Sequence, residues 1–234
     1  MDYPHRLIEG VFLRRYKRFL VDVLIDGVEI TAHIANTGAM TACTAPRAPV
    51  RLSKSDNPKR KLAYSVEQIR VQGRWIVVNS ARPNAVVAEG IAAGRVPELS
   101  GYPILKREQR LGDSRVDIFL EDGERRAWVE VKNATLRQGD ALRFPDAVTA
   151  RGTRHVRELA RVVDEHTRAV LFFHVGHEGG SWVEAAADID PEYAEALQQA
   201  VGHGVEVLAY RADIDDRRLE LGASLPVRIT TPTP

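Results

Sequence analysis

The sequence predicts two domains of different class, an OB-like β-barrel over residues 1–82 and an α/β domain over residues 83–234. Two observations lead to this division. In the first part, short segments alternate apolar and polar residues between turn residues, with no long helical pattern, which is typical of a small closed barrel. After residue 82, helical periodicity and buried-strand patterns follow one another, as they do in α/β domains.

The barrel is predicted from roughly five short strands. The run "GVFLRRYKRFLVDVLIDGVEITAHIA" alternates apolar and polar residues, and Asp26-Gly27 marks a hairpin turn within it. The segments "APVRLSKS" and "RKLAYSVEQIRVQGRWIVVNS" continue the pattern, with another turn at Gly73. An OB-like barrel is therefore the first choice for this part of the chain.

The second domain is predicted as helix, three strands, helix, strand, helix, strand. Pro83-Asn84 can open the first helix, and the stretch "RFPDAVTARGTRHVRELARVVDEH" predicts an amphipathic second helix. Asp190 is the expected cap of the third helix, "DPEYAEALQQAVGHG". The residues expected to face inward from the first two helices are Val86, Val87, Ile91, Val96, Val156, Leu159, Val162 and Val163.

Composition and charge narrow the class of protein. The chain has 234 residues, of which 33 are basic and 32 acidic, and basic residues gather in the amino-terminal half, notably between Arg47 and Lys61. This distribution predicts a local anionic partner. Cys43 is the only cysteine, which excludes an internal disulfide and a cysteine-based zinc site. No run approaches the ~20 apolar residues of a membrane span, and no signal-peptide core is present, so we expect a cytoplasmic protein without membrane contact.

The segment "SRVDIFLEDGERRAWVEVK", residues 114–132, predicts a hairpin that carries charges inside its strands. A tight turn centred on Asp122-Gly123 places Asp117 opposite Trp128, with the numbers of paired residues adding to about 245. Alternation then puts Asp117, Trp128, Glu130 and Lys132 on one face, and Val116, Ile118, Leu120, Val129 and Val131 on the other, which is the core face. Asp117 and Glu130 become diagonal neighbours, roughly 7 Å apart.

Two carboxylates at this spacing can share a divalent cation such as Mg²⁺ or Mn²⁺. A metal held by Asp117 and Glu130 could polarise a phosphodiester and activate water, while Lys132 steadies the developing negative charge. A further acidic group often comes from the preceding helix, where Glu89 is the first candidate and Glu98 the reserve. The alternative interpretation is a solvent-exposed sheet face of mixed charge, because an acid-x-lysine pair on a strand is common.

Several strings along the chain resemble the sugar fermentation stimulation protein A family of bacteria and archaea. They run in order from residue 15 to residue 210 and cover nearly the whole chain: "RYKRFLVDV", "TAHIANTGAM", "SDNPKRKLAY", "VVNSARPNAVVAEGI", "ELSGY", "SRVDIFL", "VEVKNATL", "FPDAVTARGTRHVREL", "IDPEYAEAL" and "GVEVLAY". The resemblance implies an amino-terminal OB-like domain and a carboxy-terminal PD-(D/E)xK nuclease-like domain, whose motif falls on Asp117, Glu130 and Lys132. It also implies DNA binding and a link to the regulation of sugar (maltose) metabolism. The chain departs from the family at Ile34 and Ala35, where a Cys-Pro pair is usual, and at Ala39, where a serine is usual.

Three basic segments are candidates for nucleic-acid binding, because they combine cations with aromatic or polar residues. The first has a plainer interpretation as a basic strand edge, and the third as a solvated helix face; the second supports the binding interpretation of the first. His174 and His177 are interpreted as a strand end and a loop, since no third metal ligand is in view. The candidate nucleic-acid-binding residues are Arg14, Arg15, Tyr16, Lys17, Arg18, Lys59, Arg60, Lys61, Arg151, Arg154 and His155.

The function predicted from these features is DNA binding through phosphates, with weak sequence specificity and a steep dependence on salt. No segment resembles a recognition helix for the major groove, which argues against a sequence-reading repressor. Two hypotheses share this surface: a Mg²⁺- or Mn²⁺-dependent DNA nuclease, and a catalytically silent DNA-binding regulator. A third is a module that binds a small ligand or a protein partner through the barrel.

Overall fold

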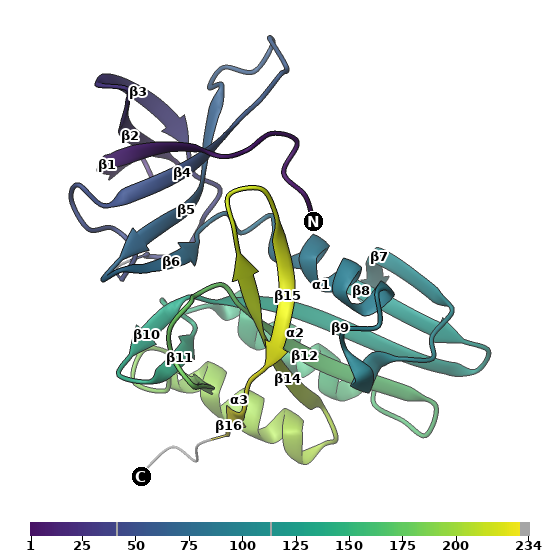
Figure 1. Ribbon diagram of the computed structural model, residues 1–234. Coiled ribbons are helices and arrows are strands. Elements are labelled where there is room, and N and C mark those ends of the chain that lie inside the picture. Colours follow the sequence, from purple (N-terminus) through teal and green to yellow (C-terminus); the bar gives the residue numbers. More distant parts are fainter. Residues whose placement is uncertain (41, 113, 230–234) are drawn as a thin grey trace.

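The protein is described by a computed structural model covering residues 1–40, 42–112 and 114–229 (Figure 1). Its amino-terminal part is a barrel whose strands follow the order β3-β2-β1-β4-β5-β6. A parallel contact between His33 of β3 and Ser65 of β5 closes the first five strands on themselves. The strands of the barrel are β1 (Ile8–Tyr16), β2 (Leu20–Ile25), β3 (Val28–His33), β4 (Pro49–Lys54), β5 (Tyr64–Val71) and β6 (Arg74–Val77).

The carboxy-terminal part is an α/β domain with a six-stranded sheet in the order β15-β14-β12-β9-β8-β7. The central strand β9 is antiparallel to β8 and parallel to β12. The elements of this sheet and its helices are α1 (Pro83–Ala92), a short 3-10 helix (Pro97–Leu99), β7 (Ile104–Leu111), β8 (Ser114–Asp122), β9 (Arg125–Ala134), α2 (Ala150–Arg161), β12 (Thr167–Val175), α3 (Pro191–Gly202), β14 (Glu206–Ile214) and β15 (Leu219–Ser224). Each predicted helix and strand is present in the predicted order, and further strands lie between and after them.

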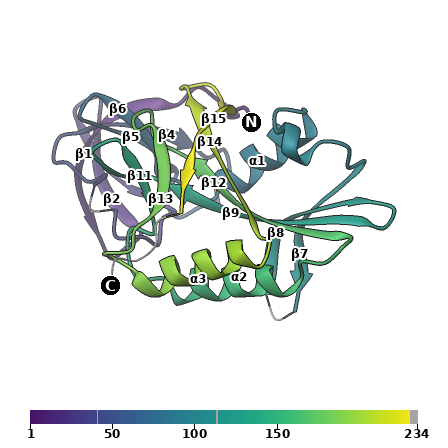
Figure 2. The same cartoon turned by 90° about the horizontal axis from the view of Figure 1, so that it is seen from below.

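Helices cover both faces of this sheet. Val129 and Val131 of β9 pack with α1 in one core, whereas Trp128 lies against the core that α2 and α3 share. Figure 2 shows α2 and α3 side by side on one face and α1 on the other. The strand face that carries Glu130 and Lys132 is therefore covered, and the interpretation of these charges as a solvated face is wrong.

A second, smaller sheet was not predicted. Its strands lie in the order β10-β11-β13-β16, with bounds β10 (Leu136–Gln138), β11 (Ala141–Phe144), β13 (Trp182–Ala185) and β16 (Val227–Arg228). These strands are two to four residues long, too short for alternation to be recognised in the sequence. The edge strand β15 was likewise not predicted.

The hairpin between β8 and β9 has a different register from the predicted one. Phe119, not Asp117, lies opposite Trp128, and Asp122 pairs with Arg125. The turn is therefore formed by Gly123 and Glu124, and Gly123 adopts a left-handed φ of 60°. Because the displacement is by two residues, each side chain stays on its predicted face.

The beginning of the chain joins the second domain. The Met1 carbonyl accepts a hydrogen bond from the Leu219 amide at 2.9 Å, and Tyr3 and Leu7 are buried with α1 and the sheet. The barrel and the α/β domain thus share contacts through the amino-terminal segment as well as through the chain between β6 and α1. None of the helices in the described ranges is long and apolar enough to cross a membrane.

Candidate functional site

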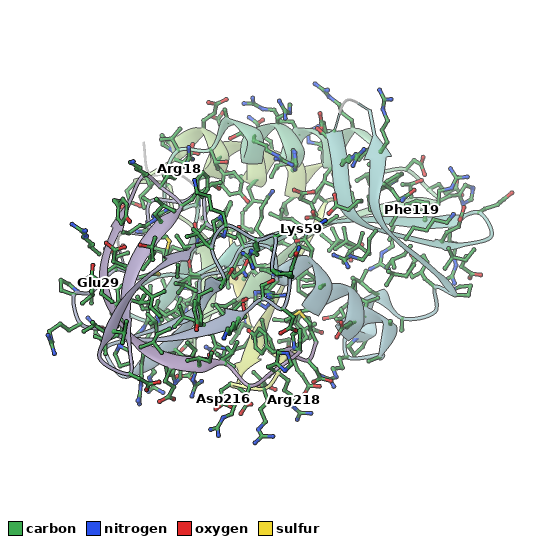
Figure 3. The ribbon with its side chains drawn as sticks, turned by 90° about the horizontal axis from the view of Figure 1, so that it is seen from above. Arg18, Glu29, Lys59, Phe119, Asp216 and Arg218 are labelled. Carbon is green, nitrogen blue, oxygen red and sulfur yellow. The ribbon has the colours of Figure 1, made fainter. Side chains whose placement is uncertain are left out.

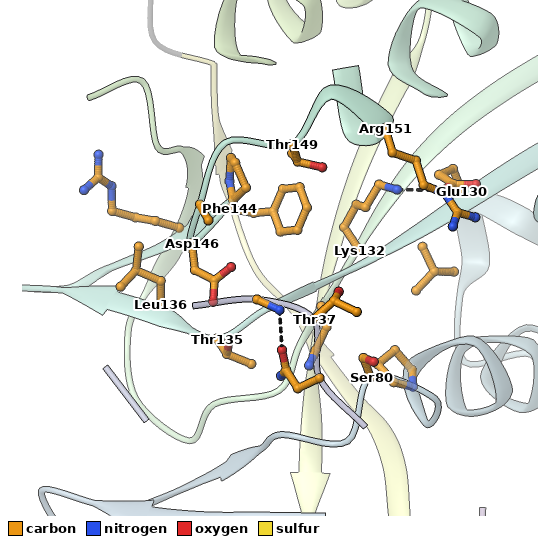
Figure 4. A pocket seen from close by; sticks show the side chains of 18 of the residues that line it. Thr37, Ser80, Glu130, Lys132, Thr135, Leu136, Phe144, Asp146, Thr149 and Arg151 are labelled. Atoms are coloured by element: carbon orange, nitrogen blue, oxygen red, sulfur yellow. Dashed lines mark hydrogen bonds and ion pairs between the residues drawn. The ribbon is translucent and has the colours of Figure 1, made fainter. Parts of the chain in front are cut away.

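A cavity of about 420 Å³ lies where the barrel meets the α/β domain. The barrel side is formed by Arg18 and the segment 36–38, and the other side by β8, β9 and the loop that leads into α2. Figure 4 shows side chains from both domains around this space, with Thr37 on one side and Phe144, Thr149 and Arg151 on the other. Asp117, Glu130 and Lys132 all line it, so the three residues of the predicted site are brought together.

Asp117 is held by two hydrogen bonds from different elements. Its Oδ1 accepts from the Asn84 side chain at 2.5 Å, and its Oδ2 accepts from the Val131 backbone N–H at 2.7 Å. The backbone pairing of β8 with β9 ends at Ile118 and Val129. Beyond that pair, the carboxylate of Asp117, and not a backbone carbonyl of β8, accepts the hydrogen bond from the Val131 amide. This arrangement fixes the carboxylate of β8 against the strand that carries Glu130.

Glu130 is 2% exposed, although it is charged. Its Oε1 accepts a hydrogen bond from Lys132 Nζ at 2.6 Å and contacts His155 Nδ1 of α2. Because His155 Nε2 accepts from Arg151 Nε at 3.3 Å, Nδ1 carries the proton that is donated to Glu130. Glu130 Oε2 is buried without a hydrogen-bond partner in the described part of the chain.

The two carboxyl groups differ in acidity. Burial, and then the charge of Glu130, raise the pKa of Asp117 to about 6, in opposition to the Val131 N–H and the Lys132 ammonium. For Glu130, burial acts in the same direction, but the hydrogen bond from His155 and the charge of Lys132 outweigh it and hold its pKa below the usual value. A bound cation would reduce the repulsion between these two buried carboxylates and favour the ionised form of Asp117.

The donor set fits a hard divalent cation. Two carboxylates converge on one cavity, and one buried oxygen, Glu130 Oε2, has no partner. Within the described ranges no three His, Cys, Asp or Glu side chains are arranged to hold a metal ion. Such an ion would then keep several water ligands, as Mg²⁺ usually does when one or two carboxylates bind it.

The predicted additional acid, Glu89, does not belong to this site. It lies on α1 with its side chain 57% exposed and forms an ion pair with the amino terminus of Met1 at 2.6 Å. The reserve candidate, Glu98, accepts a hydrogen bond from the Tyr210 hydroxyl at 2.7 Å. Asn84, at the start of α1, is the residue of that helix that reaches Asp117, because the helix points its first turn toward the cavity and its later turns away.

The prediction for His155 as a phosphate contact is also wrong, because the side chain is buried behind Glu130. Arg151, one turn before it, is exposed and lines the cavity, as a phosphate contact would require. Arg154 does not line this cavity; its side chain is 61% exposed and lies 4.0 Å from Glu158.

The basic residues of the barrel do not form one surface. Arg14 and Tyr16 both bind the buried carboxylate of Asp22, and Arg15 donates to the backbone carbonyls of the loop after β3. Arg18 is exposed at the cavity, whereas Lys17 is exposed outside it. The exposed loop between β4 and β5 holds Lys59, Arg60 and Lys61, and Figure 3 shows Lys59 well separated from Arg18.

Comparison with known proteins assigns the chain to a family. A model described as "Sugar fermentation stimulation protein RE domain" matches residues 81–218, and one described as "SfsA N-terminal OB domain" matches residues 13–78. The chain belongs to the sugar fermentation stimulation protein family. The predicted fold class is confirmed for the OB barrel and for the α/β domain that follows it.

Relatives in this family match over their full length. A sugar fermentation stimulation protein homolog of Geobacter sulfurreducens is 50% identical, with 97% of this chain and 98% of the relative covered. A homolog of Geotalea uraniireducens is 45% identical, with 98% of this chain and 100% of the relative covered. Among solved structures, the Pyrococcus furiosus SfsA in complex with Ca²⁺ is 28% identical, has a TM-score of 0.89 and matches 97% of this chain and 98% of its own.

The chain differs from the usual family motif at Ile34, Ala35 and Ala39, and at the two alanines the hydrogen bonds are made by the backbone. Ile34 is buried in the barrel core. The Ala35 carbonyl accepts from the Ser80 hydroxyl at 2.7 Å, and the Ala39 carbonyl accepts from Arg15 at 3.3 Å. Alanine at positions 35 and 39 therefore leaves these hydrogen bonds intact.

Two polar residues of the cavity, Asp146 and Asn36, were not among the candidate site residues predicted from the sequence. Asp146 accepts a hydrogen bond from the Met40 amide at 3.0 Å and so ties the loop before α2 to the barrel. Asn36 donates from its side chain to the Val78 carbonyl at 2.9 Å. Both lie in irregular segments, where no periodicity shows which way a side chain points; only the strings "FPDAV" and "ANTG" could have drawn attention to them.

Proposed function

We propose that this protein binds DNA through its phosphates and hydrolyses phosphodiester bonds with Mg²⁺ or Mn²⁺ held by Asp117 and Glu130. One observation carries the proposal: Glu130, a buried carboxylate with an unpartnered oxygen, shares a cavity with a second carboxylate and a lysine. A structural ion pair would normally satisfy both oxygens, because burying an unpaired charged group is costly.

A divalent ion at Asp117 and Glu130 would polarise the scissile phosphodiester and lower the pKa of a water molecule. The Pyrococcus furiosus relative was solved with Ca²⁺, which supports a site for a hard, oxygen-binding cation in this chain too. We include the Val131 carbonyl as a further oxygen ligand, since Val131 follows Glu130 on β9 and lines the cavity.

The protein's own groups have separate roles in this proposal. Lys132 stands 2.6 Å from Glu130 and places an ammonium group where negative charge would develop on the phosphate. His155 holds Glu130 from behind and does not reach the substrate. Arg151 and Arg18, exposed on opposite walls, are the proposed contacts to neighbouring phosphates.

The test is nicking of supercoiled plasmid at low salt with Mg²⁺ or Mn²⁺ by wild-type protein and by Lys132→Ala. A matched control is Lys106→Ala, which removes an exposed lysine of β7 that pairs with Glu121 at 3.2 Å. We expect metal-dependent nicking in the wild type and the control, and a loss of about 100-fold or more in Lys132→Ala. Nicking that persists in Lys132→Ala, with Glu130→Gln equally active, would contradict the catalytic assignment.

A second candidate function is DNA binding without turnover. It is favoured by the lack of a metal-binding set of three side chains in the described ranges and by the ion pair that already engages Lys132. If wild type and Lys132→Ala retard DNA equally and neither cuts it with either metal, the protein is a binder with a nuclease-like fold.

The proposal extends to the organisation and setting of the protein. We assign residues 1–82 to the OB barrel and residues 83–234 to the nuclease-like domain, and we place the activity in the cytoplasm. The names of the relatives suggest a link with sugar fermentation, which for this chain is part of the proposal. A cytoplasmic DNA-binding protein without a recognition helix would act on that metabolism through weakly sequence-specific contacts.

A further inference from the structure

We infer that the cavity between the two domains takes a single strand of DNA, and that a duplex cannot reach Asp117 and Glu130 without local separation of its strands. This inference rests on the proposed function and adds the substrate class to it.

The size of the cavity matches one strand. Its volume of about 420 Å³ falls near the lower end of the ~300–1,000 Å³ range of pockets that enclose small ligands. Such a space accommodates a nucleotide unit and is far too small for a double helix. Glu130 is buried in it, so a phosphodiester has to enter the cavity to meet the carboxylate. Enzymes whose target is out of reach in a duplex act on single strands or on extruded nucleotides.

The barrel wall is fixed to the α/β wall and cannot swing open without breaking several contacts. Asp146 accepts the Met40 amide at 3.0 Å, and a Cβ added to Gly38 would lie 2.5 Å from Asp146 Oδ2. A side chain at position 38 would therefore displace the Asp146 carboxylate from its present place. Arg15 donates to the carbonyls of Asn36 and Gly38 at 2.8 and 3.1 Å, which holds the same segment from the barrel side.

The basic side chains lie at the exposed edge of the cavity and the acidic Glu130 at its buried end. Arg18 of the barrel and Arg151 of α2 are exposed and line the cavity, whereas Glu130 is buried. Two cations on opposite walls can hold phosphates on either side of the one that reaches the carboxylates. Phe144, half-buried in the α/β wall, offers a ring against which a base can stack, which suits unpaired bases only.

The test is the binding of full-length protein to a labelled oligothymidylate of about 16 nucleotides, near the upper site size of an OB fold. The competitor is a blunt duplex of the same length, and EDTA prevents hydrolysis. We compare wild type with Arg18→Ala and Arg151→Ala by fluorescence anisotropy at several salt concentrations. The matched controls are Arg70→Ala, an exposed arginine that donates to the Gly73 carbonyl as Arg18 does to Thr37, and Arg161→Ala, exposed at the other end of α2.

We expect wild type to bind the single strand at least about tenfold more tightly than the duplex. Arg18→Ala and Arg151→Ala should each weaken single-strand binding by about tenfold and reduce the salt slope by about 0.7, as the loss of one phosphate contact on a single strand predicts. Equal affinity for both forms, no binding to either, or equal losses in Arg18→Ala and Arg70→Ala would overturn the inference.

The result of this binding test can be distinguished from the result of the nicking test of the proposed function. A protein that never nicks plasmid but shows the strand preference and the loss in both variants keeps the inference and loses the catalytic assignment. A protein that cuts blunt duplex DNA as fast as single strands, with Arg18→Ala as active as wild type, keeps its nuclease activity and loses the inference.

Discussion

His155 illustrates how a buried residue can act on the site through another side chain. Its imidazole contacts Glu130 Oε1 and leaves Oε2 as the oxygen available to a cation. We predict that His155→Asn weakens binding of Mn²⁺ by about 10- to 100-fold, the usual effect of removing a residue that orients a metal ligand. Titration calorimetry measures this directly. His166→Asn, an exposed histidine in the loop after α2, serves as the control, and an unchanged affinity in His155→Asn would remove its positioning role.

His174 is a second buried histidine and should make stability depend on pH. It is fully buried on β12, donates from Nδ1 to the Asn133 side chain at 2.8 Å, and has no partner at Nε2 in the described ranges. Burial lowers its pKa to about 4. Between pH 6.5 and 4 the unfolded chain therefore binds more protons at this site than the folded one, so stability falls as the pH falls.

The expected loss from His174 between pH 7 and pH 5 is about 2 kcal/mol in the free energy of unfolding. Urea unfolding at the two pH values measures it. Burial also lowers the pKa of His177 to about 4, so the wild type should show a further decrease in the same window. His174→Gln should show a smaller decrease than the wild type; an identical pH dependence in both proteins would contradict the assignment.

At the level of elements, Asp190 supports two helices at once. Its side chain caps α3 by accepting from the Tyr193 amide at 3.0 Å, and it also accepts from the Thr149 amide at 2.8 Å, just before α2. Since Thr149 is itself the cap of α2, one carboxylate fixes the relative position of the two helix starts. The sequence predicts only the first of these two roles.

We predict that Asp190→Ala lowers the free energy of unfolding by about 2 kcal/mol, the upper end of the range for a cap, because a buried and a part-buried amide lose their acceptor. Thr149→Ala removes one cap only and should cost about 1 kcal/mol. Chemical denaturation of both variants compares the two, with Asp190→Asn as the conservative control. An equal cost for Asp190→Ala and Thr149→Ala would show that the contact to Thr149 contributes nothing.

The hairpin shows what an element's sequence can and cannot specify. Its faces follow from alternation alone, so Asp117, Glu130 and Lys132 were placed together correctly. Its register depends on which two residues form the turn, and the sequence "EDGER" allows more than one choice. The structure selects Gly123-Glu124, which brings Phe119 and Trp128 together with ring centroids 4.4 Å apart.

For the whole molecule, a buried charge cluster ties the barrel to the residue just before α1. Glu67 of β5 is fully buried and accepts from Ser53, Asn79 and Arg82, the last being the residue that precedes α1. The carboxylate would be left without its counter-charge in Arg82→Ala, so we predict a loss of about 3–5 kcal/mol in the free energy of unfolding. The matched control is Arg95→Ala, whose pair with Glu220 is more exposed and should contribute less than about 1 kcal/mol. Similar losses in both variants would contradict a special role for Glu67.

Sequence alone predicted the two domains, most of their helices and strands, and three residues that meet in one cavity. Alternation and helical periodicity are local properties, so the strand-rich first part, the order of helices and strands after residue 82, and the shared face of Asp117, Glu130 and Lys132 followed from them. The partners of that site depend on contacts between distant segments, which no local pattern encodes. Only the tertiary structure decided that Asn84, and not Glu89, reaches Asp117 and that His155 is buried behind Glu130. It also decided that Asp146 ties the loop before α2 to the barrel, beside a cavity that Arg18 lines.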